Sequence, residues 1–219
     1  MKIQSLLLMN VCISLFLLAS VASHAELPEP KEVSICSGES CTPAAQKYSA
    51  EQLLNHIEKL LSLNEGEKVS LCSADSQTRN CKSKKVCHFV LGGIIPGNGC
   101  SASLTFSEVE KNQQSTQLNM KTHMPLTFIG TPLMCKIAES SIEITSINDI
   151  SLRLDPHFCS WMLVGAMAAK LEVKVESINL DRGEIAGYWR HSVKGTGNGS
   201  GSGYLLMRFP KNIIWNEPQ

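Results

Sequence analysis

A run of alternating apolar and charged residues constrains the fold of this chain more than any other feature of its sequence. Residues 171–176 read Leu-Glu-Val-Lys-Val-Glu. A period of two turns one row of side chains toward a core and the other toward water, so the run predicts an amphipathic strand. The apolar residues then move to even positions, at Ile178 and Leu180. This change of parity predicts a β-bulge near Glu176 and Ser177.

A turn and a returning strand follow directly. Residues 181–184 read Asp-Arg-Gly-Glu, in which Gly183 can take the positive φ that a tight hairpin turn requires. The returning strand alternates again, and one of its faces carries Ile185, Gly187, Trp189, His191 and Val193. A third strand begins at Tyr204, and one parity of it holds Leu205, Met207 and Phe209.

Glycine occupies every odd position from Gly195 to Gly203. The run fails the G-x-G-x-x-G pattern of dinucleotide-binding proteins, because serine or tyrosine stands at the sixth position each time. It also fails the G-x-S-x-G pattern of serine hydrolases, because no serine here has glycine two residues away on each side. Two interpretations stay open. The run is a flexible hairpin loop, or it is a strand with one bare face that a sugar ring, an acyl chain or another backbone can approach closely.

The N-terminus has the organisation of an export signal. Met1-Lys2 precedes an apolar run over residues 6–19, and Ser23-His24-Ala25 follows as a small-x-small cleavage site. We therefore predict a signal peptide over residues 1–25. The run is shorter than the roughly 20 residues that a membrane span needs, and every other long apolar segment is broken by charge or glycine. These features predict a soluble exported protein, periplasmic or extracellular, with no membrane span.

The charge of the mature chain is close to neutral. The sequence has 20 basic and 20 acidic residues, and removal of the signal peptide takes away one lysine and no acid. A balance of this kind argues against nucleic acid as a partner and against an anionic membrane surface.

Eight cysteines follow the predicted signal peptide, at positions 36, 41, 72, 81, 87, 100, 135 and 159. An even number in an exported chain indicates disulfide bonds. Loop closure favours neighbours, so we predict the pairs Cys36–Cys41, Cys72–Cys81, Cys87–Cys100 and Cys135–Cys159. The chain has no C-x-x-C and no zinc-finger or zinc-ribbon spacing, so no metal site is predicted.

One helix is expected, after an N-terminal arm over residues 26–47 that contains three prolines. Ser49-Ala-Glu-Gln52 is a capping-box sequence. Apolar residues then recur at helical spacing, at Leu53, Leu54, Ile57, Leu60 and Leu61. These signals predict a helix from about Ala50 to Leu63 that packs on a sheet through its leucine face, with His56 on the solvated side. Residues 48–215 are expected to form one domain.

The rest of the chain reads as short strands separated by polar loops. Alternating apolar rows end in Phe106, Met120, Ile144 and Leu154. Such spacing implies antiparallel pairing. Residues 156–169 are ambiguous, since Asp155-Pro156 favours the start of a buried helix whereas residues 158–164 also suit a buried strand. We expect an α+β fold, mainly an antiparallel meander, curved or partly closed, with the helix near Ala50 and a second buried helix near 156–169.

No catalytic motif is present. The histidines are dispersed, and there is no H-E-x-x-H, no phosphate loop and no calcium loop. His191 shares a strand parity with Trp189, but a histidine near a strand end is more often a surface residue. We therefore predict no catalytic residues and no cofactor, and we favour a protein that is not an enzyme.

Three function classes remain, in order of preference. The first is an exported soluble binding protein that holds an apolar or amphipathic, lipid-like ligand on a curved antiparallel sheet, with a glycan as the other candidate ligand. Its predicted ligand-binding residues are Trp161, Met167, Trp189, His191, Gly197, Gly199, Gly201 and Tyr204. The second is a disulfide-rich inhibitor or adhesin that contacts a protein partner through the loops between Cys72 and Cys100 and through the glycine hairpin. The third is a hydrolase whose site is assembled in space.

Overall fold

The structure is a computed structural model of the chain. It describes residues 27–212 except 29, 38–39, 79–80, 82–84, 87–99, 113–115, 124–125, 129–130, 136–137, 162–164, 180 and 196–198. For some strand residues it describes the backbone alone, namely 85–86, 100–102, 126–128, 131–135, 138, 155–161, 165–169, 191, 193–195 and 199–201. The predicted signal peptide therefore lies outside the described residues.

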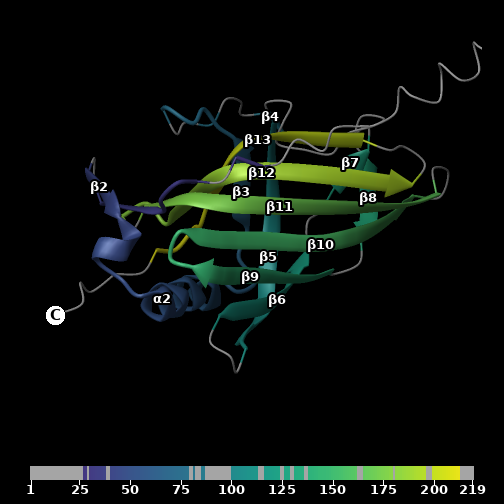
Figure 1. The fold of residues 1–219 in the computed structure, drawn as a ribbon. Helices are drawn as coiled ribbons and strands as arrows, with labels where there is room; N and C mark the ends of the chain where they lie inside the picture. The colour runs from purple at the N-terminus through teal and green to yellow at the C-terminus, as the bar shows by residue number, and fades with distance from the viewer. Residues whose placement is uncertain are drawn as a thin grey trace, which may run out of the picture.

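Strands dominate the described part of the chain (Figure 1). The N-terminal elements are β1 (Ser34–Ser37), β2 (Ser40–Pro43), the 3-10 helix η1 (Ala44–Gln46) and α2 (Ala50–Leu63). The first strands after the helix are β3 (Val69–Ser73), β4 (Lys85–Val86), β5 (Cys100–Lys111) and β6 (Gln117–His123). Next come β7 (Leu126–Phe128), β8 (Thr131–Cys135) and β9 (Ala138–Ser146). The long C-terminal strands are β10 (Asp149–Trp161), β11 (Gly165–Asn179), β12 (Glu184–Gly195) and β13 (Gly199–Arg208).

Eight of the described strands close into an antiparallel barrel. Their order is β3-β5-β6-β9-β10-β11-β12-β13, and β13 pairs back onto β3 through residues 205–208. Each barrel strand therefore neighbours the next one along the chain, which is an up-and-down meander. The predicted antiparallel meander is confirmed. The expectation of a partly closed sheet is corrected, because the pairing of β13 with β3 and of β10 with β11 leaves no open edge between these eight strands.

The interior of the barrel is built from the apolar rows that the sequence predicted. The described side chains of the rows ending in Phe106, Met120, Ile144 and Leu154 are buried in one core, together with Leu171, Val173 and Val175. The predicted bulge is present, since the register between β11 and β12 shifts between Val175 and Ser177. This shift returns Ile178 to the same core. Gly183 has a φ of 57° in the predicted turn between the two strands.

One end of the barrel lies beside α2 (Figure 1). The ammonium of Lys111, at the end of β5, donates to the Asn55 side chain at 2.6 Å, and Gly66 N–H donates to Phe106 C=O at 2.8 Å. We call this the helix end. Strands β5, β9, β11 and β13 end there, whereas β3, β6, β10 and β12 begin there. The opposite end, where β10 ends at Trp161 and β13 begins at Gly199, is called the far end.

The helix has the predicted bounds, Ala50–Leu63, and the predicted capping box between Ser49 and Gln52. Its five predicted core residues are all buried, and they join the barrel core. The expectation for His56 needs correction. Its ring is half-buried and lies edge to face with Tyr48, 5.4 Å between centroids, so this histidine packs against the residue that directly follows the N-terminal arm. Within the described residues, no helix is long and apolar enough to cross a membrane.

The predicted second helix is wrong. Residues 156–161 belong to β10 and residues 165–169 to β11, which pair with each other in antiparallel register. Asp155 and Pro156 lie where this register shifts, between Leu154 and His157. Proline has no N–H for a strand ladder and is tolerated at a bulge, so the same dipeptide that suggested a helix start marks an irregular strand.

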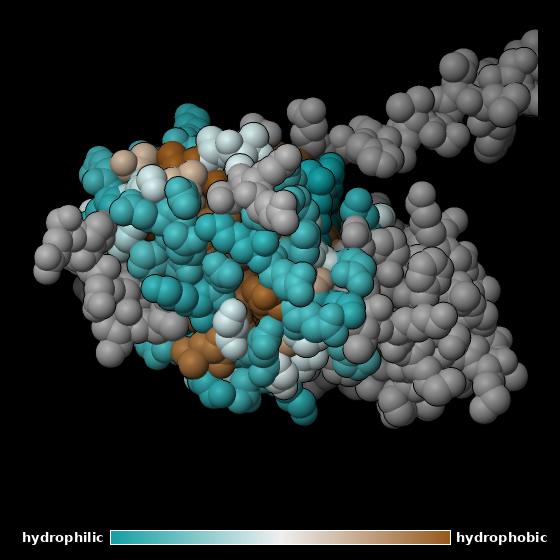
Figure 2. Space-filling view, turned by 90° about the horizontal axis from the view of Figure 1, so that it is seen from below, coloured by the Kyte–Doolittle hydropathy of each residue, from teal (hydrophilic) through white to brown (hydrophobic). Residues whose placement is uncertain are grey.

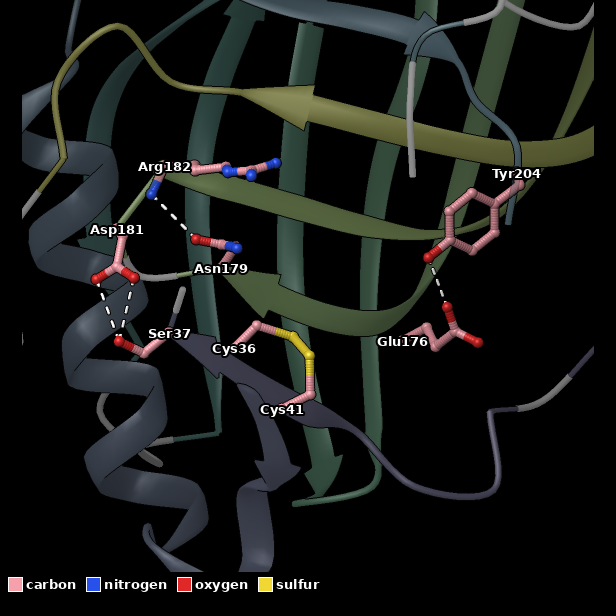
Figure 3. The surroundings of a disulfide bond; sticks show 8 residues. All are labelled: Cys36, Ser37, Cys41, Glu176, Asn179, Asp181, Arg182 and Tyr204. Atoms are coloured by element: carbon pink, nitrogen blue, oxygen red, sulfur yellow. Dashed lines mark hydrogen bonds between the residues drawn. A yellow bond between two sulfur atoms is a disulfide. The ribbon is translucent and has the colours of Figure 1, made fainter. Parts of the chain in front are cut away.

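The N-terminal arm is fastened to the barrel at the end of β11. Strand β1 pairs in parallel with residues 177–179 of β11, and β2 pairs with β1. Cys36 and Cys41 form a disulfide across β1 and β2, and the Ser37 hydroxyl donates to the Asp181 carboxylate at 3.1 Å (Figure 3). Val33 and Ile35 reach the main core. The arm thus covers the edge of β11 beyond its bulge.

Two of the four predicted disulfides are confirmed, Cys36–Cys41 and Cys72–Cys81. Cys87 lies outside the described residues, so its bond to Cys100 stays a prediction. Cys135 and Cys159 are direct backbone partners on β8 and β10. The structure describes only the backbone of these two residues, and their bond also stays a prediction.

Asn64 ties the C-terminal segment to the end of α2. Its side chain is fully buried, donates to the carbonyls of Leu60 and Lys211 at 2.7 Å, and accepts from Lys211 N–H at 2.9 Å. This is a bidentate clamp between the helix and the residues that follow β13. The clamp, together with the buried leucine face of α2, closes the helix end of the barrel.

We expect Asn64→Ala to lower the free energy of unfolding by about 2 kcal/mol, because three hydrogen bonds are lost and buried backbone groups lose their partner. Urea unfolding measures the change. Asn119→Ala is the control, since Asn119 is exposed on β6 and its replacement should change stability by less than about 0.5 kcal/mol. Equal effects of the two substitutions contradict the clamp.

Candidate functional site

Trp189 lies inside the barrel against β13. Its side chain is 1% exposed, and its register partners are Val173 on β11 and Gly203 on β13. A Cβ added at Gly203 would stand 3.0 Å from the indole nitrogen Nε1 and 3.3 Å from two ring carbons. The indole therefore packs directly on the bare backbone of β13, and a side chain at position 203 would crowd it.

The glycine row continues from this contact toward the far end. Gly199 and Gly201 are strand residues of β13, paired with Val193 and His191. They share the parity of Leu205 and Met207, which are buried in the barrel core. The row therefore belongs to the inner wall. For residues 199–203 the flexible-loop interpretation is wrong, because these residues pair with β12 in continuous register.

The backbone register shows how the other predicted site residues are placed. His191 pairs with Leu171 and Gly201, and Met167 pairs with Cys159 and Gly195. Trp161 pairs with Gly165 at the far end of β10. These three residues thus lie on the consecutive strands β12, β11 and β10, and of the three only His191 is on the strand next to the glycine row. The structure describes only their backbone, and Gly197 lies outside the described residues.

Tyr204 is on the other side of the sheet. It is buried in a second cluster with Cys72, Ala186 and Leu206, separate from the barrel core. Its hydroxyl donates to Glu176 Oε2 at 2.5 Å (Figure 3). The structure thus separates Tyr204 from Trp189. The separation follows from parity, because Tyr204 is at an even position and the glycines are at odd ones.

Glu176 is the bulged residue of β11, and it joins three strands on the outer wall. It has no register partner on β12, and its carboxylate accepts from the hydroxyls of both Tyr188 and Tyr204. Burial raises the pKa of Tyr188, and the nearby Glu176 carboxylate raises it further. The two tyrosine rings meet edge to face at 5.3 Å. This arrangement fixes the bulge to β12 and β13.

A row of ion pairs crosses the outer wall. Glu172 is almost buried and contacts Arg190 at 2.5 Å and Arg153 at 3.8 Å, and Arg153 also contacts Glu143 at 3.7 Å. The four residues lie on β9, β10, β11 and β12. On each strand they alternate with residues of the barrel core, so their charges face away from the lumen. Figure 2 shows a mainly hydrophilic surface on the described residues of that view. Among the described residues, Leu63 is the exposed large hydrophobic side chain.

Three buried hydroxyls on the inner wall were missed by the sequence analysis. Ser73, Thr122 and Ser140 are 6%, 0% and 4% exposed. Each has the parity of a buried apolar row on its own strand, as Thr122 has with Met120. Extending the alternation of each strand by one step would have found them.

The described residues show no metal centre, since no group of three histidine, cysteine or acidic side chains lies close enough to hold an ion. Comparison with protein-family models, with curated proteins and with solved structures found no match.

Proposed function

We propose that the protein binds a small apolar or amphipathic molecule inside the far half of its barrel. One observation carries the proposal. Gly199, Gly201 and Gly203 occupy three consecutive inward positions of β13, beside the buried indole of Trp189. An eight-stranded barrel is just wide enough to be filled by side chains or to hold one small ligand, as lipocalins and streptavidin do. Three inward positions without side chains favour a barrel that holds a ligand over one that is filled by its own side chains.

Access is expected from the far end. The helix end is closed by the leucine face of α2 and by the clamp between Asn64 and Lys211. A ligand therefore enters between the ends of β10, β11, β12 and β13. Lumen surfaces formed by an indole and by bare glycine backbone suit an acyl chain or a flat ring, because both offer apolar contact at close range.

The disulfides fit a protein that works outside the reducing cytosol. Cys36–Cys41 and Cys72–Cys81 are present, and bonds of this kind persist in oxidising compartments. We accordingly propose that the predicted export signal is functional and that the ligand is met in the periplasm or outside the cell.

The test compares Gly201→Val with Ser202→Val on the mature protein. Both substitutions are on β13 one residue apart, but Ser202 is exposed on the outer wall. A panel of lipids, sterols and glycans is screened by native mass spectrometry and intrinsic tryptophan fluorescence. We expect the parent and Ser202→Val to bind a lipid-like compound, and Gly201→Val to bind it at least ten-fold more weakly.

Melting temperatures separate an open lumen from a packed one. Valine in open space should shift the melting temperature of Gly201→Val by less than about 3 °C, which corresponds to about 1 kcal/mol. In a packed interior the added groups would destabilise the barrel by about 1–3 kcal/mol. A parent that binds nothing on the panel, or a Gly201→Val variant that is strongly destabilised, overturns the proposed function.

A further inference from the structure

The strand register assigns residues to the inner face of the barrel even where the structure describes only the backbone. Residues that stand directly opposite each other in an antiparallel ladder share one face of the sheet. On β11, Leu171 and Val173 belong to the barrel core. The pairing of β11 with β12 runs without a shift from Met167 to Val175. Alternate residues of β11 back to Met167 therefore lie on the inner face, and so do their partners on β12.

His191 occupies an inner position on β12. It stands opposite Leu171 on β11 and opposite Gly201 on β13. The alternation along β12 gives the same assignment, because Trp189, two residues away, is buried in the barrel core. The structure describes only the backbone of His191, so this placement rests on the register.

His157 occupies an inner position on β10. The register of β10 with β11 shifts between Leu154 and His157, and beyond this shift His157 stands opposite Ala169. Ala169 is an inner residue of β11, so the irregularity moves the inner parity of β10 from even to odd positions. The structure describes only the backbone of His157 as well. The register thus brings two histidines to the inner face, one on each side of β11.

The positions of the two histidines are close enough to serve one small ligand. Neighbouring strands lie about 4.8 Å apart and a strand rises about 3.4 Å per residue, which puts these positions roughly 12 Å apart on a flat sheet. The wall of a closed barrel curves around its lumen, so groups on the inner face converge further. The glycine row begins beside them, since Gly201 pairs with His191.

The direct neighbours of the two histidines across the ladder offer no side-chain hydrogen-bond partner. Leu171, Gly201 and Ala169 carry no polar side-chain atom. A polar group inside a protein costs free energy unless it is hydrogen-bonded, and an apolar residue would fill an inner position without this cost. A bound ligand that supplies the partner would offset the cost. An imidazole donates an N–H in both protonation states but accepts only when neutral, so a group that accepts hydrogen bonds suits both states.

We propose that the ligand is an amphipathic molecule whose polar head carries an acceptor oxygen, and that His157 and His191 bind this head. The inference rests on the proposed function and names the class of ligand for the same site. The apolar part of the ligand contacts the glycine row of β13. A carboxylate and a neutral amide both supply the acceptor oxygen, and the experiment distinguishes them.

Decanoate, decanamide and decane test the inference, because they have alkyl chains of similar length and only the first two carry an acceptor oxygen. We expect the variant His157→Leu with His191→Leu to bind decanoate, or both decanoate and decanamide, roughly ten-fold more weakly than the parent does. Its affinity for decane should be unchanged. A loss confined to decanoate identifies a carboxylate head, and a loss for both compounds identifies the acceptor oxygen alone. Titration calorimetry and tryptophan fluorescence measure the affinities.

His123→Leu is the matched control. His123 follows the buried inner residue Thr122 on β6, so it lies on the outer wall. The same substitution there should leave all three affinities unchanged. The single variants His157→Leu and His191→Leu carry the comparison if the double variant does not fold.

Two results overturn this inference and leave the proposed function standing. One is a leucine variant that binds decanoate and decanamide as tightly as the parent does. The other is a parent that binds decane, or another compound on the broader panel, but neither decanoate nor decanamide. A parent that binds none of the three compounds and nothing on the panel overturns the inference and the proposed function together.

Discussion

Gly187→Ala is expected to lower the free energy of unfolding by about 3 kcal/mol or more, because the added methyl group collides with backbone. A Cβ at this position would stand 2.0 Å from the carbonyl oxygen of Lys174 and 3.0 Å from Cα of Val175. Both atoms belong to β11 at the point where its bulge begins. Backbone atoms cannot turn away as the end of a flexible side chain can, so β11 and β12 would have to separate.

Gly66→Ala provides the matched control. Gly66 has a φ of 74° and no atom within 4 Å of an added Cβ, so alanine there meets backbone strain without any collision. That strain costs about 1–2 kcal/mol. Urea unfolding of the two variants compares collision with strain. If Gly187→Ala proves no more destabilising than Gly66→Ala, the bulge does not bring β11 as close to β12 as the structure has it.

Features with local causes could be predicted from the sequence. The bulge at Glu176 follows from a change of parity within one strand, and the helix follows from a capping box and helical spacing. Two disulfides were predicted because loop closure favours near neighbours. In each case the residues that determine the structure lie within about ten positions of one another.

Features with distant causes could not be predicted in the same way. Closure of the barrel depends on the pairing of β13 with β3, and an alternating pattern does not encode which strand becomes the partner. The helix predicted for residues 156–169 was wrong because Asp-Pro followed by an apolar run is compatible both with the start of a helix and with a bulged strand. The extended hairpin of β10 and β11 prevails through its pairing with neighbouring strands.

In the candidate site, too, local features could be predicted from the sequence and features that depend on distant strands could not. The glycine face of β13 was open to prediction from its period of two, but its contact with Trp189 required the register of β12 and β13. The buried hydroxyls of Ser73, Thr122 and Ser140 were overlooked because single serine and threonine residues resemble loop residues in a sequence. Their burial becomes apparent only when the strands that carry them close into a barrel.

Ile57→Asp is expected to destabilise the protein by about 4 kcal/mol. The Ile57 side chain is 1% exposed and joins the core that α2 shares with the barrel. The substitution removes apolar burial worth about 2–5 kcal/mol and places a carboxylate where it has no water. Because an isolated helix of this length is marginal in water, α2 depends on this packed face to stay folded and to close the helix end.

His56→Ala, one residue away, separates loss of the packed face from general damage to the helix. The histidine is half-buried against Tyr48, and loss of this edge-to-face contact should cost about 1 kcal/mol. Thermal and urea unfolding of both variants measure the difference. Because α2 closes the helix end, Ile57→Asp should also increase binding of a hydrophobic dye such as ANS below the melting temperature, whereas His56→Ala should not. Equal destabilisation by the two variants would show that the buried face of α2 has been assigned wrongly.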